Sequence, residues 1–168
     1  MAETKTIIRK ARVDDAQAAL NCDKQVWESL RNELPEPWIK ENLERLNEPD
    51  EEERFQTLIA DPTRIILVAE EDGEIIGVAH GRTEEGGLSW LGFIGVTPTH
   101  RRRGIGRQLV QEYIKESRTR GASKVSLNTA PQLKTAMKLY ADLGFVPEGY
   151  LRRHRYGVDL IIYSKFLE

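Results

Sequence analysis

A basic, glycine-containing stretch at residues 96–106, Val-Thr-Pro-Thr-His-Arg-Arg-Arg-Gly-Ile-Gly, constrains the fold of this chain more than any other segment. An apolar, β-prone run precedes it at residues 91–96, and apolar residues with helical spacing follow it. A strand that leads through a glycine loop into a helix exposes backbone N–H groups at the positive end of that helix. Arginine side chains add fork-shaped hydrogen bonds to an anion. The stretch therefore predicts a phosphate-binding loop.

The spacing of the glycines excludes the two common nucleotide-binding loops. A P-loop places four residues between its glycines and continues with Lys-Ser/Thr, whereas one residue separates Gly104 from Gly106 and Arg107 follows. A dinucleotide fingerprint needs a third glycine at the position of Leu109. A basic turn that only caps a surface helix stays open as the alternative.

Composition narrows the class of protein. With 168 residues, 39% of them hydrophobic and 31% charged, the sequence predicts a single domain over residues 1–168. It contains no apolar run of the ~18–20 residues that a membrane-spanning helix needs, and no signal-peptide core, so we expect a cytoplasmic protein without a membrane partner. The single Cys22 excludes an internal disulfide, and the three scattered histidines predict no metal site.

Charge is divided unevenly along the chain. Residues 1–90 carry 11 Lys/Arg and 21 Asp/Glu, whereas residues 91–168 carry 14 and 6. The basic half contains the predicted phosphate loop, and the acidic half could attract a cationic partner if its charges are more than a solvated surface. The arginines are not interleaved with aromatic residues and match no nucleic-acid motif, so no specific nucleic-acid partner is predicted.

Hydrophobic periodicity predicts alternating strands and helices. The predicted strands cover residues 7–11, 65–69, 75–80, 88–96, 124–128, 145–150 and 158–166. The predicted helices cover a segment from Asp14 or Asp15 to residue 30, residues 38–46, 55–60 and 105–120, and a segment from Pro131 to Gly144. An acidic loop is expected at residues 48–54 and a hairpin turn at Glu71-Asp72-Gly73. This order predicts an α/β (mixed α+β) fold with a central mixed, twisted sheet flanked by helices.

Two motifs and the order of elements resemble one known family. Val-x-Pro followed by Arg-x-x-Gly-x-Gly is similar to the pyrophosphate loop of the GNAT (Gcn5-related) N-acetyltransferases. Ala136-x-x-Leu139-Tyr140-x-x-Leu143-Gly144-Phe145 resembles the second signature of that family. The resemblance implies the GNAT acyl-CoA N-acyltransferase fold, acetyl-CoA as co-substrate and a primary amine as acceptor.

The resemblance also implies roles for individual residues. The hydroxyl of Tyr140 would point at the coenzyme A sulfur and protonate the leaving thiolate. Acetyl would pass directly to the amine in a ternary complex, because Cys22 on a predicted helix is a poor nucleophile. Contacts to the co-substrate are implied for the strand before the loop, the loop and the next strand: Phe93, Ile94, Gly95, Val96, Arg101, Arg102, Arg103, Gly104, Ile105, Gly106, Arg107 and Asn128.

The sequence departs from the family pattern at three points. Leu133 stands where many members have an asparagine that contacts coenzyme A. Asn128 stands where ribosomal-protein N-terminal acetyltransferases have a glutamate base, which argues against close equivalence to them. The strand at residues 88–96 lacks a carboxylate, so the general base is left open between a water chain, His80, and a carboxylate such as Glu28 or Glu33.

The acceptor side is less determined. The helices and loop between Trp27 and Leu46, with the loop at residues 151–157, are expected to shape an acceptor pocket. Trp27, Trp38 and Tyr150 are candidate walls of this pocket. A non-catalytic acyl-CoA-binding or sensing module and a protein N-terminal acetyltransferase are the alternative functions. Homodimers are common in the family, although the sequence contains no recognisable interface.

Overall fold

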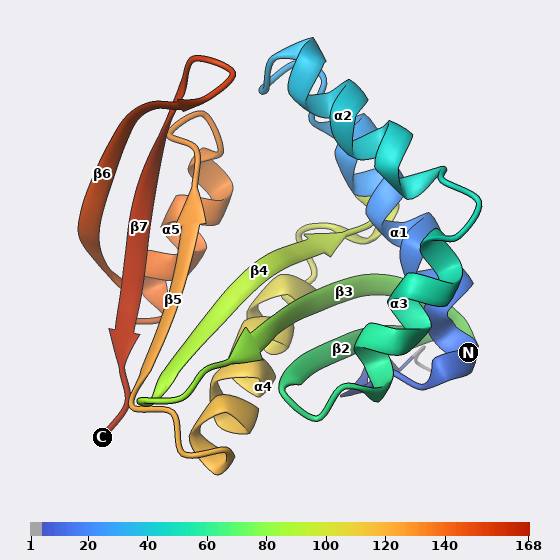
Figure 1. Cartoon of the computed structure of the whole chain (residues 1–168), viewed down its shortest axis with the longest axis horizontal. Helices are drawn as coiled ribbons and strands as arrows, with labels where there is room; N and C mark the ends of the chain where they lie inside the picture. Colours follow the sequence, from blue (N-terminus) through green and yellow to red (C-terminus); the bar gives the residue numbers. More distant parts are fainter. Residues whose placement is uncertain (1–4) are drawn as a thin grey trace.

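The computed structural model describes residues 5–168 and contains a seven-stranded mixed sheet with helices on both faces (Figure 1). The strands lie in the order β1-β2-β3-β4-β5-β7-β6. Neighbouring strands are antiparallel except for the parallel pair β4 and β5. Their bounds are β1 Ile7–Lys10, β2 Arg64–Glu71, β3 Glu74–Thr83, β4 Leu88–Val96, β5 Lys124–Thr129, β6 Val146–Arg155 and β7 Val158–Phe166. This architecture confirms the predicted fold class.

The helices cover opposite faces of the strands β2 to β4. They are α1 Ala16–Ser29, α2 Glu36–Leu46, α3 Glu51–Ala60, α4 Ile105–Thr119 and α5 Lys134–Asp142. Along β2, Leu67 packs in the cluster that contains Leu109 of α4, whereas Val68 packs in the cluster that contains Leu20 of α1. Because alternate strand residues point to opposite faces, α4 lies on one side of the sheet and α1 with α3 on the other (Figure 1). Helix α5 lies beside β5 and β7.

The predicted acidic loop at residues 48–54 is wrong in its second half. Residues 51–54 form the first turn of α3, and Glu51 is buried there. Its carboxylate pairs with Arg45 of α2 and with Arg54 one turn later. Acidic residues are also favoured at a helix N-terminus by the helix dipole. Pairing with α2 is a tertiary contact, which the local sequence pattern does not contain.

The second half of the chain differs from prediction at two element ends. Helix α5 begins at Lys134, so Pro131 does not open it, and residues 130–133 form a turn closed by the Leu133 N–H and the Ala130 carbonyl. Strand β6 continues past its predicted end at residue 150 because it pairs with β7 as far as Arg155 and Val158. The predicted turn between β2 and β3 is confirmed, with φ of 50° at Asp72 and 83° at Gly73, as a type I′ hairpin requires.

A buried polar network joins β4 to α4. The Tyr113 hydroxyl donates to the Trp90 carbonyl (2.9 Å) and accepts from the Ser89 hydroxyl (3.2 Å). Ser89 Oγ also lies 2.8 Å from Ser117 Oγ. Burial raises the pKa of Tyr113 to about 12. The network fixes the first residues of β4 against the helix that follows the phosphate loop.

Replacing Tyr113 with phenylalanine should lower the free energy of unfolding by about 1–2 kcal/mol, because two buried groups of β4 lose a hydrogen-bond partner. Chemical denaturation of the two proteins measures this difference. Tyr140→Phe is the matched control, since that hydroxyl makes no hydrogen bond within residues 5–168. Equal stability of wild type and Tyr113→Phe would contradict the role assigned to the network.

Candidate active site

The parallel strands β4 and β5 separate soon after they begin. They pair only at Leu88 with Lys124, Ser89 with Val125 and Trp90 with Ser126. Beyond these residues the strands diverge, and their facing backbone groups do not pair with each other (Figure 1). At the same point the pairing of β4 with β3 shifts by one residue, which leaves Gly92 as a bulge. The opened edge of β4 can therefore pair with an extended ligand as a further strand would.

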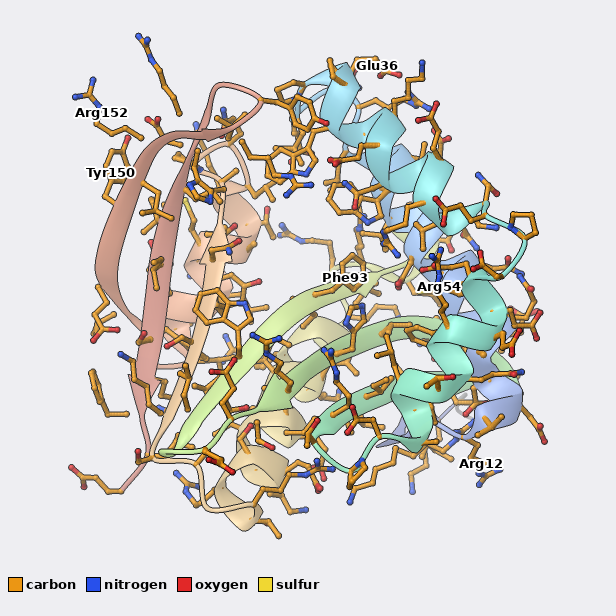
Figure 2. All side chains as sticks on the ribbon, in the orientation of Figure 1. Arg12, Glu36, Arg54, Phe93, Tyr150 and Arg152 are labelled. Carbon is orange, nitrogen blue, oxygen red and sulfur yellow. The ribbon has the colours of Figure 1, made fainter. Side chains whose placement is uncertain are left out.

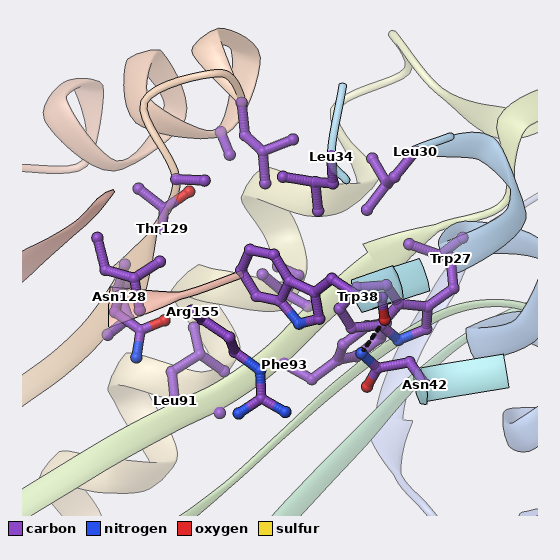
Figure 3. Close-up of a pocket in the computed structure, with 18 of the residues that line it drawn as sticks. Trp27, Leu30, Leu34, Trp38, Asn42, Leu91, Phe93, Asn128, Thr129 and Arg155 are labelled. Carbon is purple, nitrogen blue, oxygen red and sulfur yellow. Dashed lines mark hydrogen bonds between the residues drawn. The ribbon is translucent and has the colours of Figure 1, made fainter. Parts of the chain in front are cut away.

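A cavity of about 380 Å³ occupies this gap (Figure 3). Its walls come from α1, α2, β4, β5, α5 and the β6–β7 hairpin. Trp27 lies 6.2 Å from Trp38 and 6.4 Å from Phe93 between ring centroids, so three aromatic rings form one wall. The lining residues are Val26, Trp27, Leu30, Leu34, Trp38, Asn42, Leu91, Gly92, Phe93, Ile94, Leu127, Asn128, Thr129, Ala130, Leu133, Ala136, Tyr140, His154, Arg155 and Leu160.

The predicted phosphate loop has the backbone geometry of an anion site. Gly104 precedes α4 with φ of 76°, and its carbonyl accepts the first intrahelical bond from the Gln108 N–H at 3.1 Å. The N–H groups of Ile105, Gly106 and Arg107 therefore have no acceptor within the helix. A Cβ added at Gly106 would lie 3.7 Å from Leu139 of α5, which places the loop beside the helix that carries Tyr140.

The arginine side chains of the loop mostly bind other parts of the protein. Arg101 donates to the Val96 carbonyl (3.1 Å) and to Ser29 Oγ (2.6 Å), and Arg103 forms a two-bond pair with Glu71 (3.0 and 2.6 Å). This pair holds the pKa of Glu71 below its ordinary value. Arg107 lies 3.4 Å from Asp142, and Arg102 is exposed with φ of 65°. These contacts hold the loop in place, whereas contact of the arginines with a phosphate stays a prediction.

The other predicted co-substrate contacts are divided between the cavity and its edge. Phe93, Ile94 and Asn128 line the cavity. Gly95 lies against α1, where an added Cβ would come within 2.6 Å of Val26. The Val96 carbonyl holds Arg101 of the loop. Contact of these residues with a ligand stays a prediction, although the structure places them along one path from the cavity to the loop.

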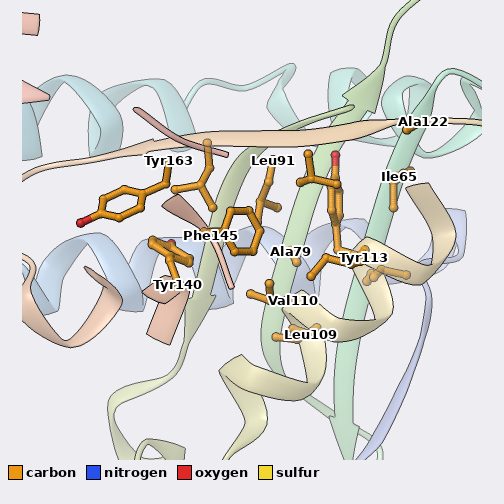
Figure 4. Close-up of a cluster of buried hydrophobic side chains, with 14 of the residues drawn as sticks. Ile65, Ala79, Leu91, Leu109, Val110, Tyr113, Ala122, Tyr140, Phe145 and Tyr163 are labelled. Carbon is orange, nitrogen blue, oxygen red and sulfur yellow. The ribbon is translucent and has the colours of Figure 1, made fainter. Parts of the chain in front are cut away.

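Tyr140 of α5 lines the cavity and also belongs to a cluster of buried hydrophobic side chains (Figure 4). It is 5% exposed and packs against the rings of Phe145 and Tyr163 at 5.8 and 6.2 Å. Burial raises the pKa of Tyr140 above its ordinary value. Unlike the Tyr113 hydroxyl, the Tyr140 hydroxyl makes no hydrogen bond to another described residue. Tyr140 therefore lines the cavity with a hydroxyl that no other described residue binds, and its role as an acid stays a prediction.

The structure separates the candidate bases. Glu28 is exposed and paired with Arg31 at 2.6 Å, and neither Glu28 nor Glu33 lines the cavity. His80 is not a lining residue either, but its ring stacks on Phe93, which lines the cavity, with 5.3 Å between ring centroids. Nε2 of His80 lies 3.7 Å from Oδ2 of Asp23, a buried residue of α1.

The acceptor side differs from the sequence-based expectation. Trp27 and Trp38 line the cavity, but Tyr150 lies exposed on the outer side of β6 and bonds to Asp159 (Figure 2). Arg155 enters the lining with its guanidinium 5.9 Å from the Trp38 ring centroid and paired with Glu41 at 2.7 Å. No aspartate or glutamate is among the lining residues. A preference for a cationic acceptor therefore receives no support from the cavity.

Sequence reasoning missed several lining residues. Thr129 carries no motif. Asn42 and Arg155 lie in the two segments that were expected to shape the acceptor pocket, but neither was singled out. Gly92 carried a usable signal, because a glycine inside a strand pattern indicates a bulge.

Three further properties concern the cysteine, the possible metal ligands and the helices of the chain. Burial raises the pKa of the Cys22 thiol to about 12, so the thiol stays protonated and unreactive at neutral pH. No cluster of three metal-ligating side chains occurs within residues 5–168. None of the helices in this described part is long and apolar enough to cross a membrane.

Comparison with known proteins agrees with this geometry. Mycothiol acetyltransferase of Thermomonospora curvata is 27% identical over 155 residues, which make up 91% of this chain and 42% of that protein. This chain thus spans less than half the length of that relative. The PaiA N-acetyltransferase of Thermoplasma acidophilum, solved with coenzyme A, superposes with a TM-score of 0.81 at 18% identity over 97% of this chain and 99% of that one.

The ribosomal-protein-alanine N-acetyltransferase of Brucella melitensis superposes with a TM-score of 0.75 at 25% identity, over 96% of this chain and 99% of that one. A model of the Acetyltransferase (GNAT) family matches residues 25–145, well over half of the sequence. The chain therefore belongs to the GNAT acetyltransferase family.

Proposed function

We propose that this protein transfers the acetyl group of acetyl-CoA directly to a primary amine in a ternary complex. One observation carries the proposal: Tyr140, whose hydroxyl has no hydrogen-bond partner among residues 5–168, lines a cavity between β4 and β5, and the N-terminus of α4 lies beyond the end of β4. An acid for the leaving sulfur and an anion site for the diphosphate thus lie on one path.

The binding step uses backbone groups. N–H groups of residues 103–106 would hold the diphosphate, with Arg101 and Arg102 adding positive charge. The open edge of β4 would pair with the amides of the pantetheine arm. A backbone N–H near Ile94 would then donate to the thioester carbonyl and stabilise the oxyanion as the amine attacks.

Tyr140 acts at the leaving group. The amine nitrogen forms a bond to the acetyl carbonyl carbon, and the bond from that carbon to sulfur breaks. The expelled thiolate takes the phenolic proton of Tyr140, which burial has kept in place. Cys22 is protonated and buried, which supports transfer without an acetyl-enzyme intermediate.

A panel of amines, with release of free thiol from acetyl-CoA as the readout, tests the proposal. The panel should contain a neutral aromatic amine, an amino acid, a polyamine and a peptide with N-terminal alanine, because a structural relative is named for alanine acetylation. We expect at least one amine to be acetylated, with intersecting double-reciprocal plots.

Two outcomes would contradict the proposal. Parallel double-reciprocal plots would indicate a covalent intermediate instead of a ternary complex. Tight binding of acetyl-CoA without transfer to any amine would favour a non-catalytic acyl-CoA-binding module.

A further inference from the structure

His80 and Asp23 form a pair behind the cavity wall that the proposed mechanism does not yet use. His80 lies on β3 directly opposite Phe93 of β4, and the two rings stack at an interplanar angle of 17°. The ring of Phe55 of α3 lies edge-on to the imidazole, with 5.9 Å between centroids and an interplanar angle of 76°. The His80 side chain is 29% exposed, so it reaches water although it stands between two aromatic rings. Figure 2 shows Phe93 on the side of β4 that faces the helices.

Asp23 is a buried carboxylate whose burial is unfavourable for the stability of the fold. It is 3% exposed, and its Oδ1 is completely shielded from solvent without a hydrogen-bond partner within residues 5–168. Burial raises the pKa of Asp23, with His80 and Arg45 acting against that shift and Glu51 adding to it. Glu51 is itself held by Arg45 and by Arg54 of α3. Of these groups, His80 is the one that lies directly against Asp23, with its Nε2 3.7 Å from Oδ2.

The position of Asp23 beside His80 suits a proton acceptor. A buried carboxylate without a partner is unfavourable, and an imidazolium 3.7 Å away would compensate its charge. Transfer to an amine requires a group that accepts a proton, because an amine is mostly protonated at neutral pH. Only the neutral amine attacks a thioester. Neither Glu28 nor Glu33 lines the cavity, and β4 has no carboxylate. His80 does not line the cavity either, but its ring stacks on the lining residue Phe93, whereas Glu28 is exposed and paired with Arg31.

We infer that His80 accepts the proton of the acceptor ammonium, through water at the edge of the cavity, and that Asp23 is the positioning residue that stabilises the resulting imidazolium. The inference rests on the proposed function and adds its missing base. The chemistry agrees with a carboxylate that orients a histidine and becomes its counter-ion.

The protons balance in this scheme. His80 takes one proton from the ammonium, and the freed lone pair forms the bond from nitrogen to the acetyl carbon. The bond from that carbon to sulfur breaks, and the sulfur leaves with the electron pair and takes a proton from Tyr140. The nitrogen then loses a second proton, which returns to the Tyr140 oxygen through solvent, and His80 releases its proton to solvent. One ammonium and one thioester thus yield one amide, one thiol and one proton.

The test is the pH profile of kcat/KM, measured for the whole chain with the best amine of the panel. For wild type we expect an acid limb set by His80. His80→Gln should be about 100-fold slower near pH 7 and should recover tenfold per pH unit toward the pKa of the amine, because only amine that is already neutral then reacts. Glu28→Gln, the matched control at a rejected base, should keep the wild-type profile.

Asp23→Asn is a second test variant, for which we expect a lower rate but a higher melting temperature than wild type. Loss of the counter-ion should move the acid limb to lower pH and reduce the rate on the plateau. The raised pKa of Asp23 means that the folded chain binds this proton more tightly than the unfolded chain. Ionisation of Asp23 thus lowers the free energy of unfolding at pH values above about 4, which is the pKa of an aspartate in the unfolded chain. Below that pH it has no such effect. We expect Asp23→Asn to melt about 2–4 °C higher than wild type at pH 7, with the gain vanishing near pH 3.

The outcomes separate the two proposals. A wild-type acid limb in His80→Gln, a loss of rate by the same factor at every pH, or an unmoved limb in Asp23→Asn would overturn the role of the pair while leaving acetyl transfer intact. If wild type acetylates no amine, the proposed function fails, and the role of His80 fails with it. A limb that moves only in Glu28→Gln would assign the base to that residue instead.

Discussion

Replacing Tyr140 with phenylalanine is expected to lower kcat by about 100-fold or more, the usual contribution of a positioned acid. The affinity for acetyl-CoA and the stability should change little, because the hydroxyl makes no hydrogen bond to another described residue. Stability of the variant is expected within about 0.5 kcal/mol of wild type. Turnover of the amine measures kcat, calorimetry with acetyl-CoA measures the affinity, and chemical denaturation measures the stability.

The pH dependence of this loss is a further check. Burial raises the pKa of Tyr140 above the ordinary value of about 10, so the phenol keeps its proton over the working range. Wild type should therefore have no alkaline limb from this group, and the ratio of wild-type to Tyr140→Phe rates should be constant from about pH 6 to 9. Wild-type kcat in Tyr140→Phe would exclude Tyr140 as the acid.

The second large effect is expected at the N-terminus of α4. Gly104→Asp should weaken binding of acetyl-CoA, whereas Gly104→Asn should bind it more tightly than the aspartate variant by about 30-fold, or ~2 kcal/mol, at low salt. Both side chains enter open space, since an added Cβ meets no atom within 4 Å. Both also tolerate the φ of 76° better than other residues do, so the pair differs mainly in one negative charge.

Calorimetry at two salt concentrations measures this comparison. The difference between the two variants should shrink as salt rises, because the charge is exposed to solvent. An aspartate at this position also favours the helix N-terminus, which keeps loss of fold from explaining weaker binding. Equal dissociation constants for Gly104→Asp and Gly104→Asn would remove the anion site from the loop.

Local sequence patterns predicted the elements where short-range forces dominate. The turn at Asp72-Gly73 and the start of α4 after Gly104 depend on backbone conformations that few residues adopt, and both were found where predicted. Predictions were wrong where a partner distant in sequence decides. Glu51 lies in the first turn of α3, where it pairs with Arg45 of α2. Strand β6 is longer than predicted because β7 pairs with it. Tyr150, predicted as a pocket wall, lies exposed on β6, where its hydroxyl bonds to Asp159 of β7.

For the candidate site, the sequence by itself determined the helix N-terminus with its glycines and the helix that carries Tyr140, because their conformations and residue types are local properties. Only the tertiary structure decided that β4 leaves β5 after three pairs, that Tyr140 faces the resulting cavity without a hydrogen bond, and that Asp23 is buried beside His80. These facts depend on how α1, β3, β4 and β5 pack together. Burial and pairing across more than fifty residues of sequence are set by the whole fold, and no local pattern encodes them.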